Sequence, residues 1–387
     1  MKKVFFLAVL SLIITSPLVA HADNGMWHKI ALNKEHVVSI SADPVQPSTL
    51  YAVTSMGLLK SIDRGRNWTK LKGELPSDIP PSAVAVNPFN SQEIFVGFDG
   101  RGIFKSNDGG STWASLNDGL QNLYVRCIVI SPKAPNLIYV GIQNGIAITT
   151  NGGKLWHMAF GFKRATNVNA VVIDPKNPQF LYAATGGGGV YKSGNGGVSW
   201  KDINEGLSSL SILDIHVDPE NPDILLAGAY HPATPTDLYV GEASGGVYRS
   251  EDGGRTWHET PLLNITIFSF TDHPDLPGVI YAGAWGGAYR SIDKGKTWID
   301  INSGLDNAFL HKVHLLSGTP PEILAGTTFG LLSFTDTELG EQMGRSSANL
   351  QSWQLYGCIC TIGLFCMAGV FWLRNRKKRA EEQRDAW

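Results

Sequence analysis

Short apolar segments alternate with polar turns along most of this 387-residue chain. A representative unit contains four such segments, separated by turns rich in Gly, Pro and Asn: 168–173, 180–184, 189–192 and 200–203. β-Branched and aromatic runs bounded by those residues are typical of strands, and no segment shows a convincing amphipathic helix period. The pattern predicts an all-β domain built from four-stranded units.

The first segment of each unit is apolar almost throughout, as in Val168–Ile173. A strand with one solvated face would alternate between apolar and polar residues, whereas a strand covered on both faces reads as a continuous apolar run. In a radial stack of four-stranded sheets, neighbouring blades cover the inner strands on both sides. The architecture that fits is a β-propeller.

An eight-residue motif recurs at the end of the third segment of each unit. Ser61–Trp68 has the form S-x-D-x-G-x-T-W, and its six copies place the closing Trp residues 45, 43, 44, 57 and 41 positions apart. A period in the forties is typical of propellers. An Asp or Asn at the third position can accept backbone N–H bonds inside a tight turn, so these residues are interpreted as structural. The predicted structural set is Asp63, Asp108, Asn151, Asn195, Asp252 and Asp293, together with Trp68, Trp113, Trp156, Trp200, Trp257 and Trp298.

The ends of the repeat region set the blade count. Residues 27–30 match the strand that follows each motif, yet no motif precedes them, and the last unit, residues 312–334, contains only three strands. If the N-terminal strand completes the C-terminal sheet, the ring has seven blades and no exposed sheet edge at its closure. Six blades with an appended strand pair is the alternative.

Both ends of the chain resemble targeting segments. Residues 1–22 have the charged start, apolar centre and small-residue cleavage site of a signal peptide. Residues 353–373 are uncharged and long enough to cross a membrane, and a basic tail follows. We expect a signal peptide (1–22), a propeller (23–340), a linker (341–352), a transmembrane helix (353–373) and a basic cytoplasmic tail (374–387). The propeller would then lie on the periplasmic or extracytoplasmic side of the cytoplasmic membrane, on a single-pass anchor.

Charge and cysteine content narrow the function classes. A formal net charge of −2 argues against nucleic acid as a partner. Cys127 is the only cysteine of the predicted exported domain, so that domain has no internal disulfide, and its apolar neighbours indicate a small core residue. The ten His residues are scattered without the spacing of metal ligands. No cofactor or metal is predicted.

Candidate binding residues lie on the rim opposite the repeated motif, in loops between second and third strands and between blades. The fifth unit carries an insertion there, from about 230 to 244. Loops of this length in a compact fold are often functional, although a tolerated surface insertion explains it equally well. The predicted partner-binding residues are His231, Asp237, Tyr239, Glu242, Trp285, Arg101, Tyr124, Arg126 and Arg164, with Asp99, Lys163 and Phe329 as further rim candidates.

The six motifs resemble the Asp-box, or BNR, repeat family. That family includes sialidases, the sortilin ectodomain, xyloglucan-degrading hydrolases and propellers that assist photosystem II assembly. The resemblance covers residues 27–336 and implies a propeller fold, but it says little about activity, because function is carried by sites that differ among proteins of one fold.

The same comparison was made for enzymatic activity. The Arg-Ile-Pro signature of sialidases is absent. A glycosidase of the xyloglucan-degrading kind needs two carboxylates, which Asp99, Asp214 and Asp237 could supply. Such enzymes join two propellers around a cleft, however, and this chain predicts one. No catalytic residue is therefore assigned.

The residues together favour a non-catalytic, membrane-anchored propeller. Its predicted role is to bind a membrane protein or a subunit of a membrane complex, as a scaffold or assembly factor similar to the photosystem II assembly propellers. The alternative is a glycan-binding or glycoside-hydrolysing surface protein. An aromatic platform formed by Trp285, Tyr239 and Phe329 would favour that alternative.

Overall fold

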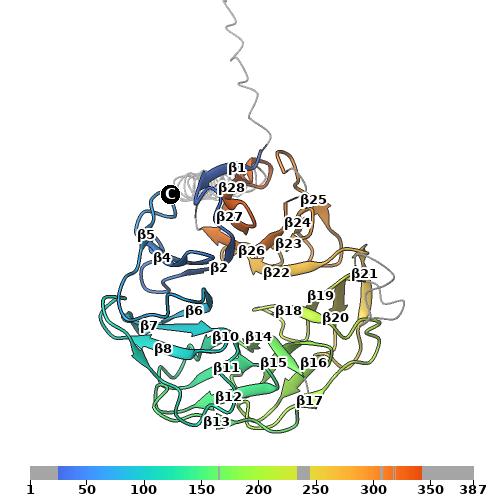
Figure 1. Ribbon diagram of the computed structural model, residues 1–387. Coiled ribbons are helices and arrows are strands. Elements are labelled where there is room, and N and C mark those ends of the chain that lie inside the picture. The colour runs from blue at the N-terminus through green and yellow to red at the C-terminus, as the bar shows by residue number, and fades with distance from the viewer. Residues whose placement is uncertain are drawn as a thin grey trace, which may run out of the picture.

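The structure, a computed structural model, describes residues 25–163, 166–232, 245–305, 308–316, 318 and 320–341. Over these ranges the chain forms 28 strands in seven four-stranded antiparallel sheets. The sheets are arranged radially around a central axis, and each sheet is one blade (Figure 1). The prediction of an all-β, seven-bladed propeller is confirmed.

Each blade contains four strands that are numbered outward from the axis. Blades 1 to 3 comprise β2 (Val37–Ala42), β3 (Leu50–Thr54), β4 (Gly57–Ser61) and β5 (Thr69–Lys70); β6 (Pro81–Asn87), β7 (Asn90–Phe98), β8 (Gly102–Ser106) and β9 (Ala114–Ser115); and β10 (Val125–Ile130), β11 (Ile138–Ile142), β12 (Gly145–Thr149) and β13 (His157–Met158). Blades 4 and 5 comprise β14 (Asn167–Ile173), β15 (Leu181–Gly186), β16 (Gly189–Ser193) and β17 (Lys201–Asp202); and β18 (Ile212–Val217), β19 (Leu225–Ala229), β20 (Gly246–Ser250) and β21 (His258–Leu263). Blade 6 comprises β22 (Ile267–Asp272), β23 (Ile280–Ala284), β24 (Gly287–Ser291) and β25 (Ile299–Asp300), and blade 7 comprises β26 (Leu310–Leu316), β27 (Glu322–Thr327), β28 (Gly330–Thr335) and β1 (His28–Ala31).

The two ends of the repeat region meet in blade 7. Strand β1 pairs antiparallel with β28, with His28 opposite Ser333, and the two lie side by side at the top of Figure 1. Trp27, just before β1, donates its indole N–H to the carbonyl of Ile301 in blade 6 at 2.7 Å. The N-terminal strand thus closes the ring, as the three-stranded last unit indicated.

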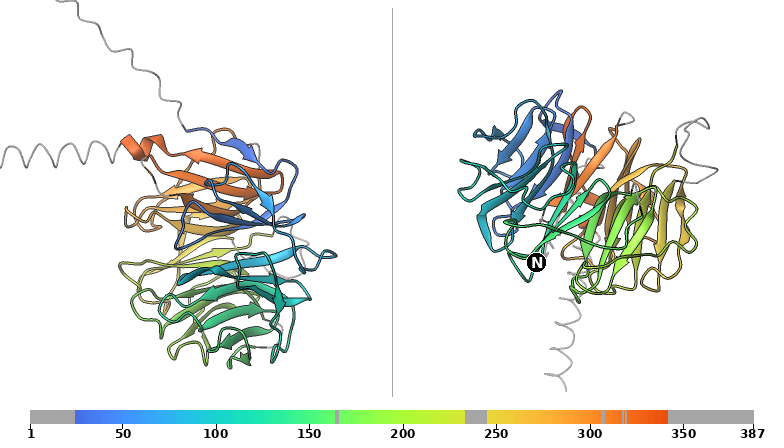
Figure 2. Two further views of the ribbon diagram at one scale, coloured as in Figure 1. Left: turned by 90° about the vertical axis from the view of Figure 1, so that its left-hand side faces the viewer. Right: turned by 60° about the horizontal axis from the view of Figure 1, so that its bottom comes forward.

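The hydrophobic core lies between neighbouring blades. Phe95 of blade 2, for example, packs in one cluster with Ile128 and Trp156 of blade 3. All five residues of β3, β11, β19 and β23 are buried. Figure 2 shows the sheets stacked face to face around the ring, which explains why the inner strands are apolar on both faces.

The repeated motif forms a self-contained turn between the third and fourth strands. In the turn of blade 2, the Ser106 hydroxyl donates to Asp108 at 2.7 Å and accepts the N–H of Gly110 at 2.8 Å. The Asp108 carboxylate accepts the backbone N–H and the hydroxyl of Thr112, and these bonds lower its pKa to about 2. The six motif glycines have φ between 78° and 97°, a region that favours glycine.

Basic side chains of the third strands join each blade to the next. Lys60, Lys192 and Arg249 donate to backbone carbonyls in the motif turn of the following blade. Blade 7 lacks a full motif, and there Arg290 forms a buried ion pair with Asp336 at 2.5 Å. The Tyr281 hydroxyl donates to the same carboxylate at 2.9 Å. This pair substitutes for the missing turn.

The predicted signal peptide, transmembrane helix and basic tail lie outside the described residues, as does nearly all of the predicted linker. Within the part of the chain that is described, no helix is long and apolar enough to span a membrane.

Candidate ligand-binding face

The two ends of the blades carry different turns. The lower face holds the motif turns and the turns between first and second strands. The upper rim holds the turns between second and third strands and the segments that lead into each first strand. The rim turns are short in most blades: Ser55 and Met56 join Thr54 to Gly57, and Thr328 and Phe329 join Thr327 to Gly330.

Three consecutive blades present large apolar side chains on these upper turns. Trp285 of blade 6, Phe329 of blade 7 and Met56 of blade 1 are 38%, 62% and 59% exposed. At the corresponding turns, blade 2 has Arg101 and blade 3 has Asn144. We call the three exposed side chains the apolar arc.

An aromatic cluster fixes Trp285 from below. Its ring packs against Phe309 with centroids 4.6 Å apart, and its backbone N–H donates to Thr266 at 2.9 Å. Phe309 in turn contacts Phe268 and His311. Trp285 is therefore held in place by its neighbours, a property that lowers the entropy cost of binding a ligand.

A pair of histidines lies at the inner end of this cluster. The Nε2 atoms of His36 and His311 are 2.9 Å apart, so one ring donates and the other accepts. Burial, and secondly the charge of His36, lower the pKa of His311 to about 4. Both rings therefore stay hydrogen-bonded in the neutral form at physiological pH.

The turns of Phe329 and Met56 are rigid in the same way. In blade 7, the Thr327 hydroxyl accepts the N–H of Phe329 at 3.1 Å and donates to the carbonyl of Gly330 at 2.9 Å. In blade 1, Thr54 makes the same pair of bonds to Met56 and Gly57. The backbone thus holds both exposed side chains out of the core.

Blades 2 and 3 give the rim a charged sector instead. Arg101 pairs with Asp78 at 2.5 Å, and Arg126 lies 3.8 Å from Asp99. Tyr124, 47% exposed, pairs through its backbone with Asp99. Each of these two carboxylates is therefore already held by an arginine.

The predicted rim residues are only partly brought together. Trp285 and Phe329 share the apolar arc, and Arg101, Tyr124 and Arg126 share the charged sector. His231 is half-buried, where its backbone N–H donates to the Thr266 hydroxyl at 2.9 Å. Lys163 pairs with Asp202 at 2.8 Å. Four of the predicted residues lie outside the described ranges: Arg164, Asp237, Tyr239 and Glu242.

Sequence reasoning missed three members of the site: Met56, Phe309 and His36. Met56 was detectable, because it occupies the same turn position as Phe329 when the repeats are aligned. Phe309 and His36 precede first strands in segments that vary in composition, so alignment offers no signal for them. Only the ring closure shows that blades 6, 7 and 1 are neighbours.

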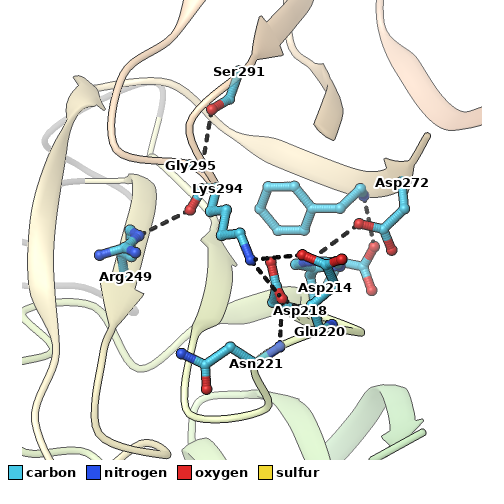
Figure 3. Close-up of polar contacts among 11 residues, drawn as sticks. Asp214, Asp218, Glu220, Asn221, Arg249, Asp272, Ser291, Lys294 and Gly295 are labelled. Carbon is cyan, nitrogen blue, oxygen red and sulfur yellow. Dashed lines mark hydrogen bonds and ion pairs between the residues drawn. The ribbon is translucent and has the colours of Figure 1, made fainter. Parts of the chain in front are cut away.

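A separate cluster of titratable groups lies between blades 5 and 6, toward the lower face (Figure 3). Burial, and secondly the charge of Asp218, raise the pKa of Asp272 to about 7. Its carboxylate lies 3.3 Å from Nε2 of His216, whose pKa burial lowers to about 4. Lys294 donates to Asp218 at 3.2 Å.

Asp214 is the other carboxylate of that cluster, and it joins two blades. Its two oxygens accept the backbone N–H groups of Ile215 and of Phe270 in blade 6, both at 2.9 Å. Ser269 makes the corresponding bond from blade 6 to Val313 of blade 7 at 3.0 Å. Burial raises the pKa of Asp214. Its bonds serve the contact between blades.

Cys127 occupies the corresponding position in blade 3. Burial raises the pKa of its thiol to about 12, so it stays protonated at physiological pH. Within the described ranges, no group of three or more His, Cys, Asp or Glu side chains is arranged to hold a metal ion.

Comparison with known proteins gives local sequence matches and a shared fold. No protein-family model matches the chain. A probable oligoxyloglucan-reducing end-specific xyloglucanase from Neosartorya fischeri is 26% identical over 29% of this chain and 16% of its own length. A xyloglucanase from Hypocrea jecorina is 29% identical over 25% of this chain and 13% of its own. The chain thus matches well under a fifth of these relatives.

Solved structures with the same fold fall into two groups. An ancestral GH74 enzyme superposes with a TM-score of 0.64 and 22% identity, over 80% of this chain and 46% of that one. YCF48 bound to D1 peptide gives 0.61 and 15%, over 81% and 96%. YCF48 from Cyanidioschyzon merolae gives 0.58 and 17%, over 81% and 99%. These likenesses establish the β-propeller fold.

Proposed function

We propose that this protein binds an oligosaccharide or polysaccharide on the apolar arc of its upper rim. The observation that carries the proposal is the exposed indole of Trp285, stacked on Phe309 and followed in the next two blades by Phe329 and Met56. Flat apolar side chains that are held rigid suit the apolar faces of sugar rings, because covering them removes apolar area from water without ordering mobile groups. The local identity to xyloglucanases supports this ligand class.

Binding without cleavage is the form of the proposal that the described residues favour. A glycosidase needs one carboxyl to protonate the leaving group and a second one nearby. Asp78 and Asp99 on the upper rim are paired with arginines, and Asp214 accepts two backbone N–H bonds. All three carboxylates therefore have a structural partner that accounts for them.

The test is a calorimetric titration with neutral xyloglucan and β-1,4-glucan oligosaccharides. Trp285→Ala and Phe329→Ala should each weaken binding about tenfold, the effect of removing a central aromatic contact. Phe160→Ala is the matched control, because Phe160 is a 71% exposed aromatic outside the arc. Equal binding by all three variants, or no binding by the parent protein, would falsify the proposal. Analysis of the sugars after incubation should show no new reducing ends.

A protein partner is the second candidate, and chain length favours it. The propeller covers 96% of YCF48 bound to D1 peptide but only 46% of the GH74 enzyme. In this version the apolar arc docks a segment of a membrane protein or membrane-complex subunit, and the protein acts as a scaffold or assembly factor. Photocrosslinking in cells from positions 285 and 329 distinguishes the two. Adducts with one membrane protein would favour the scaffold, and adducts with glycan would favour the first proposal.

An extracytoplasmic location suits both candidates. We propose that residues 1–22 direct export and that residues 353–373 form the single membrane anchor. A reporter enzyme that is active only outside the cytoplasm, fused after residue 340, should be active. The same reporter fused after residue 387 should be inactive.

A further inference from the structure

The upper rim contains a pocket beside the apolar arc, in the groove between blades 1 and 2. Its volume is about 350 Å³, and Met56 of the arc is among its lining residues. Leu58, Leu71 and Phe98 contribute apolar surface. The loop that closes it contains Pro76, Pro80 and Pro81, whose fixed φ angles restrict the wall. The size is that of a small-ligand site.

The pocket exists because blade 1 departs from the repeat. In blades 2, 4 and 6, an asparagine follows the fourth strand and accepts the N–H of the third strand at 2.7 to 2.8 Å. That side chain fills the space over the glycine that begins the third strand: an added Cβ would lie 2.1 to 2.3 Å from the asparagine oxygen. The three pairs are Gly102 with Asn117, Gly189 with Asn204, and Gly287 with Asn302.

In blade 1, Lys72 stands where those asparagines stand. The pairing of the backbone fixes the alignment, because Leu71 donates to Leu58 as Leu116 donates to Ile103 in blade 2. The Cβ position of Gly57 is met only by the flexible end of Lys70, at 3.1 Å. Blade 1 therefore lacks the asparagine plug and has an open pocket in its place.

The charge of the pocket also departs from the repeat. Lys70 pairs with Leu59 across the sheet, and the same position holds Asp202, Glu259 and Asp300 in blades 4, 5 and 6. Both Lys70 and Lys72 are exposed. Asp78 is the sole carboxylate among the described lining residues, and Arg101 already binds it at 2.5 Å. Two lysines thus face a space whose own carboxylate is neutralised.

We infer that this pocket binds the carboxylate of an acidic sugar, a uronic acid, in a glycan that also lies on the apolar arc. The inference rests on the proposed function and specifies its ligand. The arc covers the apolar faces of neighbouring sugar rings, while the Lys70 and Lys72 ammonium groups bind the carboxylate of a further ring beyond Met56. Charge-assisted hydrogen bonds of this kind contribute more than neutral ones.

The experiment compares two probes on the full-length protein: a β-1,4-linked oligosaccharide of about six rings that is neutral, and the same oligosaccharide carrying one uronic acid. The acidic probe should bind about tenfold more tightly at low salt, and the advantage should shrink at high salt as screening increases. It should also shift the methyl resonance of Met56, which lines the pocket.

Three variants locate the effect. Lys70→Gln combined with Lys72→Gln should abolish the tenfold advantage and leave neutral binding unchanged. Lys72→Asn should do the same by restoring the plug that blades 2, 4 and 6 already tolerate, so a folding defect is not expected. Lys201→Gln, which alters an exposed lysine of blade 4, is the matched control.

The two proposals fail differently. If the neutral probe binds but the acidic one has no advantage, or if the advantage survives in both lysine variants, the acidic-sugar site is overturned and glycan binding stands. If neither probe binds, both proposals fall. Tighter binding of a glutamate-rich peptide than of the acidic sugar, lost in the same variants, would assign the pocket to a protein ligand instead.

Discussion

The lower face and the upper rim of this propeller obey different constraints. On the lower face, six motif turns repeat one set of bonds, in which a Ser or Thr hydroxyl donates to an Asp or Asn and accepts a glycine N–H. On the upper rim, the turns of successive blades differ in residue type, from Met56 to Arg101 to Asn144. The repeated face stabilises each blade, whereas the variable rim is free to diversify for binding.

The largest test of this comparison removes the part of the lower face that does not repeat. Asp336→Ala should destabilise the protein by about 3 kcal/mol, because it leaves the buried Arg290 guanidinium without its main partner. Urea unfolding measures the change. Glu338→Ala is the control, because Glu338 contacts the same arginine but is 69% exposed, and its loss should cost under about 0.5 kcal/mol. Equal effects of the two variants would contradict a closing role for Asp336.

A smaller effect is expected in the repeated turns. Asp293→Ala should cost about 1 kcal/mol, by analogy with the loss of a capping side chain, and Asp293→Asn should cost less, because the amide oxygen still accepts the N–H of Thr297. Hydrogen bonds to Thr297 and Ser291 lower the pKa of Asp293 despite its partial burial. The aspartate's contribution is therefore present above its ordinary pKa of about 3.9 and is lost as the pH falls through the lower folded value. Chemical denaturation of both variants from pH 2 to 7 tests this.

Asp272 gives an effect of similar size and opposite sign. The corresponding residues of the other blades are all apolar, from Ala42 in blade 1 to Leu316 in blade 7. Because its folded pKa is raised to about 7, the folded state binds more protons than the unfolded state between about pH 4 and 7, and stability falls as the pH rises through that window.

Asp272→Asn should remove that dependence. The expected gain at pH 8 is about 1 kcal/mol, a value reduced for solvent screening because the side chain is 38% exposed. The two proteins should converge near pH 4, which chemical denaturation across the range would show. Asp300→Asn, an exposed carboxylate of the same blade, should have no effect at either pH.

The sequence was sufficient for the fold because the fold is written several times over. Six motifs in register, four apolar segments per unit and a stray N-terminal strand next to a three-stranded last unit define seven blades. Trp27 illustrates the point: it resembles a motif tryptophan without a motif, and the structure places it against Ile301 at the closure.

The candidate site could be predicted only in part, for a physical reason. Trp285 and Phe329 stood out as rim aromatics, but their proximity to Met56 depends on closure of the ring between blades 7 and 1. The pocket beside Met56 arises from an asparagine that is missing in blade 1, and such a gap becomes visible only when the space that Asn117 fills in blade 2 is known. The acids suggested for catalysis illustrate the converse. Asp214 has the right chemistry, but both of its oxygens accept backbone bonds.

The smallest effect expected on stability is at the apolar arc itself, and it sharpens the comparison most. Phe329→Ser should change the free energy of unfolding by under about 0.5 kcal/mol, because the side chain is 62% exposed and its turn is held by the Thr327 hydroxyl. Thr327→Val removes that hydroxyl and should cost about 1 kcal/mol. Thermal and urea unfolding of the two variants decide the matter. A large loss in Phe329→Ser would mean that this aromatic belongs to the core, whereas an unchanged stability with weakened ligand binding is the behaviour of a side chain kept on the surface for a partner.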